Sequence, residues 1–323
     1  MSVDIGDIEA IQIPEPFGLS HSGGSGFRIG TVYECPRKAA LTLLGWTTKR
    51  TAFYFAFGTL IHRHAFRPYL GDGDVDPKAA RAETQDMVDT EKAVSATYVG
   101  IDGKEHTETQ DIAVKASDRA EAPVVASNMM TVWSEGRYPD VDVTACEERV
   151  RSPVRDPDTG GEPEEFQAFR VLGRLDMVLR RGDVWAVRDF KTARSKLKAE
   201  WFSNLDYHRQ LSLYRYAWAS VRGEIVNDVG AYQMTKHKTL KAVRENSGEV
   251  ILAKPLRFRT IYDEVTGAIR RLRECERTGV WPCNPFSCAG KFGEPCPFMP
   301  LCWADQYDDP NEWKKTLRRR GEP

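Results

Sequence analysis

The sequence contains no run of about eighteen apolar residues, so no membrane-spanning helix is expected among its 323 residues. The stretch from Met1 to Pro16 is acidic and contains proline, without the basic segment and apolar run of a secretory signal. A cytoplasmic protein is therefore expected. There is no internal repeat, no low-complexity tract and no G-x-x-x-x-G-K-[ST] loop, so the chain carries no helicase signature of its own.

The net charge is also small, at −1, which argues weakly against a dedicated nucleic-acid scaffold. The charges are spread unevenly, because acidic residues dominate 72–121 and basic residues gather later. This asymmetry suits a protein with one basic channel and an acidic back, although solvent-exposed helix faces would give the same pattern. The later basic positions are Arg188, Lys191, Arg194, Lys196, Lys198, 236–241, Arg270, Arg271, Arg273 and 314–320.

Composition and periodicity predict a globular α/β protein. Hydrophobic residues make up 41% and charged residues 29% of the chain, which is enough for a substantial core. The order of the predicted helices and strands places a mixed central sheet of about four or five strands between helical layers. Helices are predicted at 29–44 (interrupted near Pro36), 57–70, 77–98, 122–134, 206–221 and 255–278, and strands at 141–150, 166–180, 184–191 and 228–235.

Gly173-Arg174-Leu175-Asp176 and Asp189-Phe190-Lys191-Thr192 are the most informative stretches, and together they read as one β-hairpin. Apolar, β-prone residues lie between them, and Arg181-Gly182-Asp183 supplies the turn. Side chains alternate along a strand, so the acid and the lysine of the second motif point to the same face. If the register brings the acid of the first motif beside them, two carboxylates and one ammonium converge on a small volume.

Asp176, Asp189 and Lys191 would together suit the cutting of a phosphodiester. Two carboxylates so placed can hold a divalent cation. A lysine next to that cation can orient a water molecule or stabilise developing negative charge. The same residue types also occur on ordinary strands, where an exposed Asp/Lys pair only interacts with solvent, so the pattern alone leaves both interpretations open.

Seven cysteines are present, and four of them fall between positions 283 and 302. In a cytoplasmic protein such a dense group indicates metal binding rather than disulfides. Cys288, Cys296 and Cys302 lie among glycines and prolines that make tight turns, and Cys283 is the alternative third or fourth member. Thiolate ligands permit Zn²⁺ or an iron–sulfur cluster, and the spacing does not decide between them because there is no paired C-x-x-C.

The other three cysteines are isolated in the sequence. Cys146 and Cys275 fall in a predicted strand and a predicted helix, where a small buried hydrophobe is expected. Cys35 precedes Pro36-Arg37-Lys38, far from the other cysteines, and composition alone makes it a free thiol.

Three further motifs flank the hairpin. Residues 33–38 read Y-E-C-P-R-K, residues 58–62 read G-T-L-I-H, and residues 210–214 read Q-L-S-L-Y. Together with the hairpin and the cysteines, and in this order, they resemble the RecB/Cas4-like branch of the PD-(D/E)xK nuclease superfamily. The resemblance extends from about Leu19 to Trp303.

This resemblance implies a restriction-endonuclease-like core whose N- and C-terminal segments are tied by an iron–sulfur cluster. It divides the chain into an irregular lead-in at 1–27, a single nuclease domain at 28–303 and a basic tail at 304–323. The nuclease domain would carry a helical insertion at about 72–135 and an iron–sulfur clasp at 283–303.

The resemblance also implies the roles of individual residues. Lys191 would deprotonate or orient the attacking water. Gln210 and Tyr214 would position that lysine and the DNA backbone. The residues that would hold one or two Mg²⁺ or Mn²⁺ ions are His62, Asp176, Asp189 and the carbonyl of Phe190.

A further acid precedes the Asp176 motif, at a position where relatives often carry glutamate. Glu147 is preferred over Glu148 from its offset to Val150 and Pro153, and its role is left open. The second acid of the hairpin is aspartate rather than glutamate, which the wider family tolerates.

Cys35 would supply the first ligand of a [4Fe–4S] cluster, and Cys288, Cys296 and Cys302 the other three. Their spacing is wider than the compact arrangement common in Cas4 proteins, so Cys283 could replace Cys288. The cluster would stabilise the fold and could shape a channel that threads a strand.

The implied function is that of a metal-dependent DNA exonuclease acting on single-stranded DNA or DNA ends, in recombination, repair or phage DNA metabolism. Arg194, Lys196 and Lys198 would bind flanking phosphates, which makes DNA binding sensitive to salt. DNA is the expected partner, with a helicase or recombination protein as a further one, and the oligomeric state is open. Two other classes are also open: a catalytically silent nuclease fold that binds DNA within a larger complex, and a structural or redox iron–sulfur protein.

Overall fold

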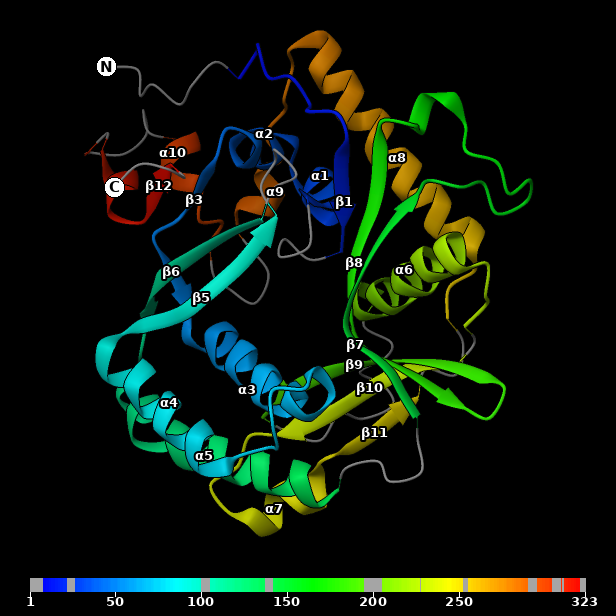
Figure 1. Ribbon diagram of the computed structural model, residues 1–323. Coiled ribbons are helices and arrows are strands. Elements are labelled where there is room, and N and C mark those ends of the chain that lie inside the picture. Colours follow the sequence, from blue (N-terminus) through cyan, green and yellow to red (C-terminus); the bar gives the residue numbers. More distant parts are fainter. Residues whose placement is uncertain are drawn as a thin grey trace.

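The computed structural model describes residues 8–21, 27–99, 105–136, 142–194, 205–226, 228–251, 255–289, 295–303, 309 and 311–319 (Figure 1). No helix in these ranges is both long enough and apolar enough to cross a membrane. The strands are β1 Phe17–Ser20, β2 Phe27–Arg28, β3 Trp46–Thr48, β4 Arg50–Ala52, β5 Lys92–Val99, β6 Glu105–Ala113, β7 Asp142–Pro153, β8 Phe169–Arg181, β9 Val184–Ala193, β10 Asp228–Thr235, β11 Gly248–Ile251 and β12 Leu317–Arg319. The helices are α1 Ile29–Glu34, α2 Pro36–Leu43, α3 Phe53–Leu70, α4 Pro77–Thr90, α5 Ala116–Glu135, α6 Leu205–Arg222, α7 Leu240–Asn246, α8 Phe258–Thr278, α9 Pro285–Cys288 and α10 Met299–Cys302, with short 3₁₀ turns at Glu164–Phe166 and Glu312–Lys315.

A mixed seven-stranded sheet forms the centre of the fold, in the order β11-β10-β9-β8-β1-β2, with β7 paired to β8 as well. β8 runs antiparallel to β7 and β9, whereas β9 and β10 are parallel and joined through α6. Two small sheets, β12-β3 and β4-β6-β5, lie apart from it. The fold is therefore α/β, with a mixed central sheet flanked by helices, as the sequence predicts.

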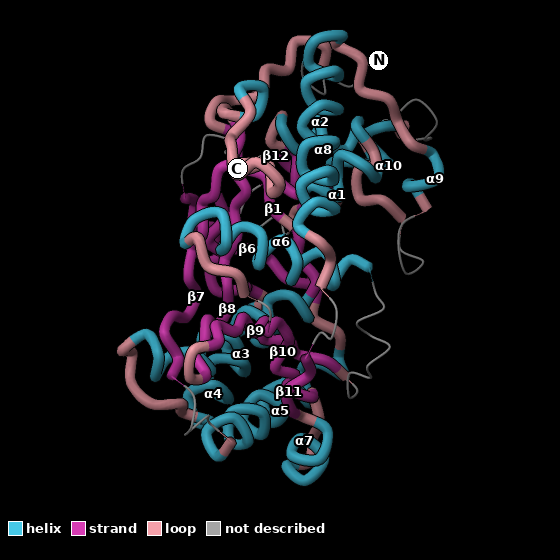
Figure 2. The backbone as a smooth tube through the Cα atoms, turned by 90° about the vertical axis from the view of Figure 1, so that its right-hand side faces the viewer, coloured by secondary structure: helices cyan, strands magenta, loops and turns pink. Residues whose placement is uncertain are grey.

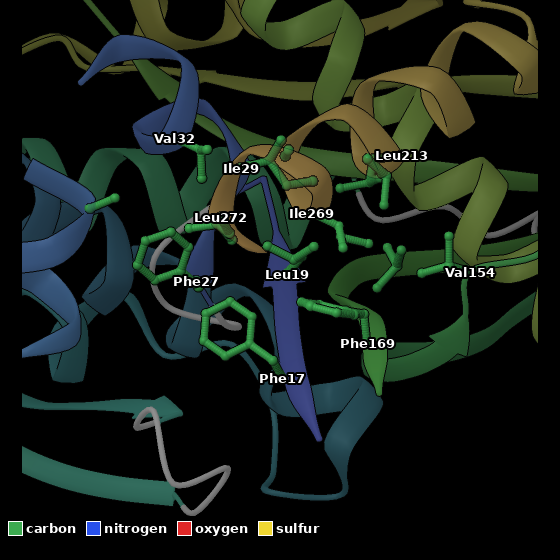
Figure 3. Close-up of a cluster of buried hydrophobic side chains, with 14 of the residues drawn as sticks. Phe17, Leu19, Phe27, Ile29, Val32, Val154, Phe169, Leu213, Ile269 and Leu272 are labelled. Atoms are coloured by element: carbon green, nitrogen blue, oxygen red, sulfur yellow. The ribbon is translucent and has the colours of Figure 1, made fainter. Parts of the chain in front are cut away.

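Two apolar cores lie on opposite faces of the sheet, because alternate strand residues point to opposite sides. On β9, Val187 belongs to the first core and Ala186 to the second. Helices α1, α2, α6 and α8 cover the first core, where Leu19 of β1 lies beside Phe169 of β8 and Ile269 of α8 (Figure 3). Helices α3, α4, α5 and α7 cover the second core and gather at one end of the molecule (Figure 2).

The helix boundaries follow local chemistry. Cys35 is extended (φ −164°) ahead of Pro36, the first residue of α2, and this separates α1 from α2 near the predicted interruption. The carboxylate of Asp76 caps α4 by accepting hydrogen bonds from the amides of Lys78 and Ala79. Gly71 ends α3 in the left-handed conformation (φ 79°).

The sheet is larger than the four or five strands predicted from the sequence. β1, β2 and β11 have only four, two and four residues, too few to show a clear alternation. β1 also lies within the lead-in 1–27 that was expected to be irregular, and it is ordered by parallel pairing with the distant strand β8. Long-range pairing of this kind has no local sequence signal.

The region 72–135 is likewise not wholly helical. Helix α4 ends at Thr90, and Glu91 takes a left-handed conformation (φ 53°) at its C-terminus. The following residues form β5, antiparallel to β6, instead of continuing the helix predicted at 77–98. Residues 77–98 are polar and show no strong periodicity, so the sequence does not distinguish one long helix from a helix followed by a strand.

Candidate active site

The candidate site lies where β8 and β9 separate. Their antiparallel pairing runs from Arg181 opposite Val184 to Met177 opposite Arg188, so the same register would bring Asp176 opposite Asp189. On the same edge of β8, β1 pairs only with residues 169–171. In the described structure this leaves residues 172–176 unpaired on that edge, and the first acidic motif ends in this gap.

Asp176 occupies the gap and is held by the backbone of the neighbouring strand. The amide of Phe190 donates a hydrogen bond of 2.7 Å to Asp176 Oδ2. The exposed fractions of Asp176 and Asp189 are only 6% and 2%, so Asp189 does not belong to the solvent-exposed Asp/Lys pair of the alternative interpretation. Two carboxylates buried this deeply require partners that compensate for their lost hydration.

Asp189 and Lys191 point to the same face of β9, as the alternation predicts. Lys191 Nζ lies 2.6 Å from Asp189 Oδ2 and donates to Gln210 Oε1 at 3.3 Å. The amide of Gln210 donates in turn to the hydroxyl of Tyr214 at 2.9 Å, one turn further along α6. Burial raises the pKa of Asp189, although the charge of Lys191 opposes this shift. The Q-x-x-x-Y motif thus holds the lysine against the second acid.

His62 on α3 approaches the same point from the second core. Its Nε2 lies 2.6 Å from the carbonyl oxygen of Phe190, and its Nδ1 lies 3.7 Å from Asp176 Oδ2 and 3.9 Å from Glu147 Oε1. The ring packs edge-on against the Phe190 ring at 4.9 Å. Burial alone would lower the pKa of His62, but the charge of Asp176 and the contact with Glu147 outweigh it, so the pKa is raised.

Glu147 completes this group of side chains. It has a left-handed backbone conformation (φ 53°), which is uncommon for a residue other than glycine and marks a locally constrained site in β7. Its second carboxylate oxygen lies 2.7 Å from Arg174 Nε. The next residue, Glu148, pairs instead with Arg222 at 3.1 Å. The geometry therefore agrees with the preference for Glu147 over Glu148.

His62, Glu147 and Asp176 could hold one metal ion, because one ligand atom from each lies within 4.8 Å of the others. The set of one imidazole and two carboxylates suits a divalent cation such as Mn²⁺ or Mg²⁺. The predicted ligands Asp189 and Phe190 adjoin this group: Asp189 through its charge on His62, and Phe190 through both its amide and its carbonyl. Arg174, which fixes Glu147, is a member of the first acidic motif whose role the sequence did not indicate.

The basic residues near the site differ in their surroundings. Arg194 is exposed and follows the end of β9, whereas Lys196 and Lys198 lie outside the described residues. Arg188, also counted among the basic residues, is fully buried, with contacts to Asp228 at 2.7 Å and Glu249 at 2.5 Å. Its charge is therefore used inside the fold and not on a DNA-binding surface.

The cysteines from the two ends of the chain approach one another. The backbone of Asn284 contacts cysteines from both ends. Its N–H group donates a hydrogen bond to Cys35 Sγ at 3.4 Å, and its carbonyl oxygen accepts one from Cys288 Sγ at 3.8 Å. The amide of Cys296 donates to the carbonyl of Cys288 at 2.8 Å. Cys35, expected from composition to be an isolated thiol, thus lies beside the C-terminal group.

Two further thiols belong to the same neighbourhood. Burial raises the pKa of Cys283 to about 11, and the nearby Cys35 and Cys288 add to the shift. Burial likewise raises the pKa of Cys302 to about 12, together with Cys283 and Cys296. Among the described residues, no three of these sulfurs lie within 4.8 Å of one another, so they do not surround a point as the ligands of one ion would.

The remaining cysteines are separate from this group, as predicted. Cys275 is buried in α8 as part of the first core. Cys146 in β7 packs against the second core but is only partly buried, in contrast to the buried residue that the sequence predicts. Both behave as small apolar side chains.

Comparison with known proteins identifies one family. A family model described as the PD-(D/E)XK nuclease superfamily matches residues 25–303. No curated protein matches the chain. Among solved structures, one titled "Crystal structure of SSO0001" is similar at 11% identity, covering 72% of this chain and 83% of that one, with a TM-score of 0.29. That TM-score is too low to support an inference.

Proposed function

The chain belongs to the PD-(D/E)XK nuclease superfamily, and from this premise we propose that it is a metal-dependent DNA exonuclease of the RecB/Cas4-like type. The observation that carries the proposal is the convergence of His62, Glu147 and Asp176 with the Asp189–Lys191 pair. The proposed reaction is hydrolysis of phosphodiester bonds in single-stranded DNA or at DNA ends. Recombination, repair and phage DNA metabolism in the cytoplasm are the proposed settings, with a helicase or recombination protein as partner.

The proposed metal ligands and Lys191 have separate roles in the reaction. A divalent cation bound by His62, Glu147 and Asp176 would supply Lewis-acid stabilisation of the charge that develops on the phosphate. Asp189, which lies beside these ligands, and the Phe190 carbonyl complete the proposed ligand set. The Phe190 amide orients Asp176, and Arg174 orients Glu147, so both carboxylates are fixed before a cation arrives.

Lys191 is the proposed residue that orients the attacking water. Its ammonium is held from two sides, by Asp189 at 2.6 Å and by Gln210 at 3.3 Å, and it keeps an exposed side-chain fraction of 30%. It is therefore positioned and still reachable by solvent. Tyr214 contributes indirectly, because its hydroxyl accepts from the Gln210 amide and fixes the orientation of that side chain.

We further propose that Cys35, Cys288, Cys296 and Cys302 hold a [4Fe–4S] cluster. The proposal is supported by the contacts of both Cys35 and Cys288 with the backbone of Asn284, and by the proximity of Cys302 to Cys296. Four thiolates on a single Zn²⁺ would lie about 3.8 Å apart, from a Zn–S distance of about 2.3 Å and tetrahedral geometry. The more open arrangement suits a larger group, whose contribution would be to fasten the fold. Cys283 lies in the same neighbourhood and is the alternative to Cys288.

End-labelled DNA tests the nuclease proposal. With Mg²⁺ or Mn²⁺ the wild-type protein should degrade the DNA, and Lys191→Ala should slow degradation by at least about 100-fold. Lys241→Ala is the matched control, since Lys241 is an exposed lysine on helix α7, which carries none of the proposed site residues. Undiminished activity in Lys191→Ala would refute the catalytic assignment. Labels on the 5′ or the 3′ end would also reveal the polarity.

The same experiment separates the two alternatives. A catalytically silent DNA-binding module would bind the labelled DNA and leave it intact in both metals. A structural or redox iron–sulfur protein would neither bind nor degrade it. The buried, mutually oriented acids and lysine favour the enzyme over both.

A further inference from the structure

Tyr54 and Phe55, in the first turn of α3, are adjacent aromatic residues exposed to solvent. Their exposed fractions are 56% and 62%, whereas Phe53 and Phe57 on either side are buried at 8% and 2%. The two exposed rings contact each other, with centroids 4.3 Å apart and planes inclined at 41°. Together they form a continuous aromatic surface, and not two isolated apolar side chains.

The aromatic pair lies on the helix that carries a proposed metal ligand. Phe55 and His62 are seven residues apart, so they project from nearly the same side of α3 at an axial separation of about 10.5 Å. Gly58 lies between them, and a Cβ at that position would be 3.6 Å from Thr192 Oγ1. This side of α3 therefore passes the end of β9, and the aromatic pair lies beyond that end.

Basic residues flank this part of α3. Lys236, directly after β10, donates its backbone amide to the Ala193 carbonyl, and its Nζ lies 5.2 Å from the Phe57 ring. Arg194, directly after β9, is exposed and near enough to act on Lys236. Burial lowers the pKa of Lys236 to about 8, the charge of Arg194 lowers it further, and Asp118 opposes the shift. Two basic residues therefore lie close together at the ends of β9 and β10, and their charges would attract the phosphates of a polyanion.

We propose that Tyr54 and Phe55 form a stacking platform for unpaired bases of a single-stranded DNA, whose backbone runs past Arg194 and Lys236 toward the metal site. This inference rests on the proposed nuclease function and narrows its substrate to single-stranded DNA. Interior bases of a duplex are stacked on both faces, so an unpaired strand is what can place successive base faces against exposed rings. At about 3.4 Å per stacked nucleotide, the separation from His62 corresponds to about three nucleotides.

Binding measurements with a twelve-nucleotide oligo(dT) and a twelve-base-pair blunt duplex test the platform. Both can be followed by fluorescence anisotropy in Ca²⁺, with intact DNA verified after each titration. Because stacking on one ring changes affinity by roughly 5- to 150-fold, the double variant Tyr54→Ala/Phe55→Ala should raise the Kd for oligo(dT) by at least about tenfold. Its Kd for the duplex should change by less than about twofold.

Two control variants separate stacking from a general defect. The double variant Tyr54→Phe/Phe55→Tyr retains both rings and should bind oligo(dT) like the wild type. Val184→Ala removes a comparably exposed apolar side chain at the far turn of the β8–β9 hairpin and should leave degradation of oligo(dT) unchanged. A 2-aminopurine placed along the oligonucleotide should be quenched by the wild type and not by the Ala/Ala variant.

The outcomes distinguish the platform from the nuclease proposal. If the wild type degrades oligo(dT) but the Ala/Ala variant binds it with unchanged Kd, the platform is refuted and the nuclease function stands. An equal loss of duplex and oligo(dT) affinity would also refute the platform, because it would show no preference for unpaired bases. If the wild type degrades the blunt duplex but does not bind oligo(dT), the platform is likewise refuted, and if with Mg²⁺ or Mn²⁺ it degrades neither DNA, the nuclease proposal itself fails.

Discussion

Four consecutive residues of β9 have different functions because alternate side chains face different environments. Arg188 and Phe190 point toward the second core, where the guanidinium is neutralised by Asp228 and Glu249 and the ring packs against His62. Asp189 and Lys191 point to the other face and pair with each other. A shift of one residue in register would exchange the two pairs and bury Lys191 without a site.

Glu147 provides a direct test of the metal site. Glu147→Gln keeps the shape of the side chain but removes one carboxylate, so we expect Mn²⁺ affinity, measured by calorimetry, to fall by about 10- to 100-fold. Glu148→Gln is the matched control, because Glu148 is its neighbour and contacts Arg222 instead. Equal losses in both variants would contradict the assignment of Glu147 as a ligand.

The raised pKa of His62 predicts how metal affinity depends on pH. A proton and a metal ion compete for the ring, and Asp176 and Glu147 hold the proton to higher pH than the ordinary value of 6.5. We therefore expect Mn²⁺ affinity to fall, by up to about tenfold per pH unit, as the pH decreases through this raised pKa. For the folding stability of the metal-free protein, the pH dependence has the opposite sign. The stabilisation by protonated His62 is complete below pH 6.5 and is lost as the pH rises through the raised pKa.

Calorimetric titrations with Mn²⁺ between about pH 5.5 and 8.5 would measure this dependence. His62→Ala should weaken binding and flatten the slope, whereas His237→Gln, in an exposed histidine after β10, should preserve it. A slope that survives in His62→Ala would assign the titration to another group, such as Asp189.

At the scale of elements, the close approach of α6 to β8 explains the glycine of the Gly173-Arg174-Leu175-Asp176 motif. A Cβ at Gly173 would lie 3.1 Å from Val150 Cγ2 and 3.2 Å from Tyr214 Cδ1. A larger residue would require Val150 or Tyr214 to shift by a few tenths of an ångström, so the glycine favours the close approach of α6 to the strand with Asp176. The two motifs therefore depend on each other for their position.

Gly173→Ala should consequently lower the free energy of unfolding by about 1–3 kcal/mol, because Tyr214 or Val150 must move. The displacement should also slow DNA cleavage, since Tyr214 fixes Gln210 and Gln210 contacts Lys191. Gly248→Ala in β11 is the control, since a Cβ there meets nothing within 4 Å. Urea denaturation would measure both variants, and an unchanged midpoint for Gly173→Ala would contradict this account.

At the scale of the whole molecule, the cysteine group joins segments about 250 residues apart, as shown by the contact between Asn284 and Cys35 with a separation of 249. A covalently held group at this point would close nearly the whole described domain into a loop. Such closure restricts the unfolded chain, so its loss should affect the stability of the entire domain.

We expect Cys35→Ser, Cys296→Ser and Cys302→Ser to lose the visible absorbance of the proposed cluster and to lower the Tm after anaerobic purification. Cys283→Ser and Cys288→Ser show which of the two residues is the fourth ligand. Only the variant of that ligand should lose the absorbance and lower the Tm. Cys275→Ala is the control, since its thiol is buried in α8 away from the group. Wild-type protein that contains zinc, or neither iron nor sulfide, would refute the cluster.

The sequence by itself determined the features that depend on local patterns. Apolar, β-prone runs around a turn predicted the β8–β9 hairpin, and strand alternation predicted the common face of Asp189 and Lys191. Helical spacing predicted α6, on which Gln210 and Tyr214 lie one turn apart. Pro36 predicted the break between α1 and α2. These features need only the geometry of neighbouring residues, so they can be recognised without the fold.

Only the tertiary structure decided the features that depend on pairing between distant residues. The β1–β8 pairing, the assembly of Glu147 with His62 and Asp176, and the approach of Cys35 to Asn284 join segments that no local signal connects. The surroundings of each charged side chain also depend on the tertiary structure, since Arg188 is fully buried and Lys191 partly exposed according to strand register, although both are basic residues of one strand. Burial is a property of the packed molecule, and it separates residues of the core from residues available for chemistry.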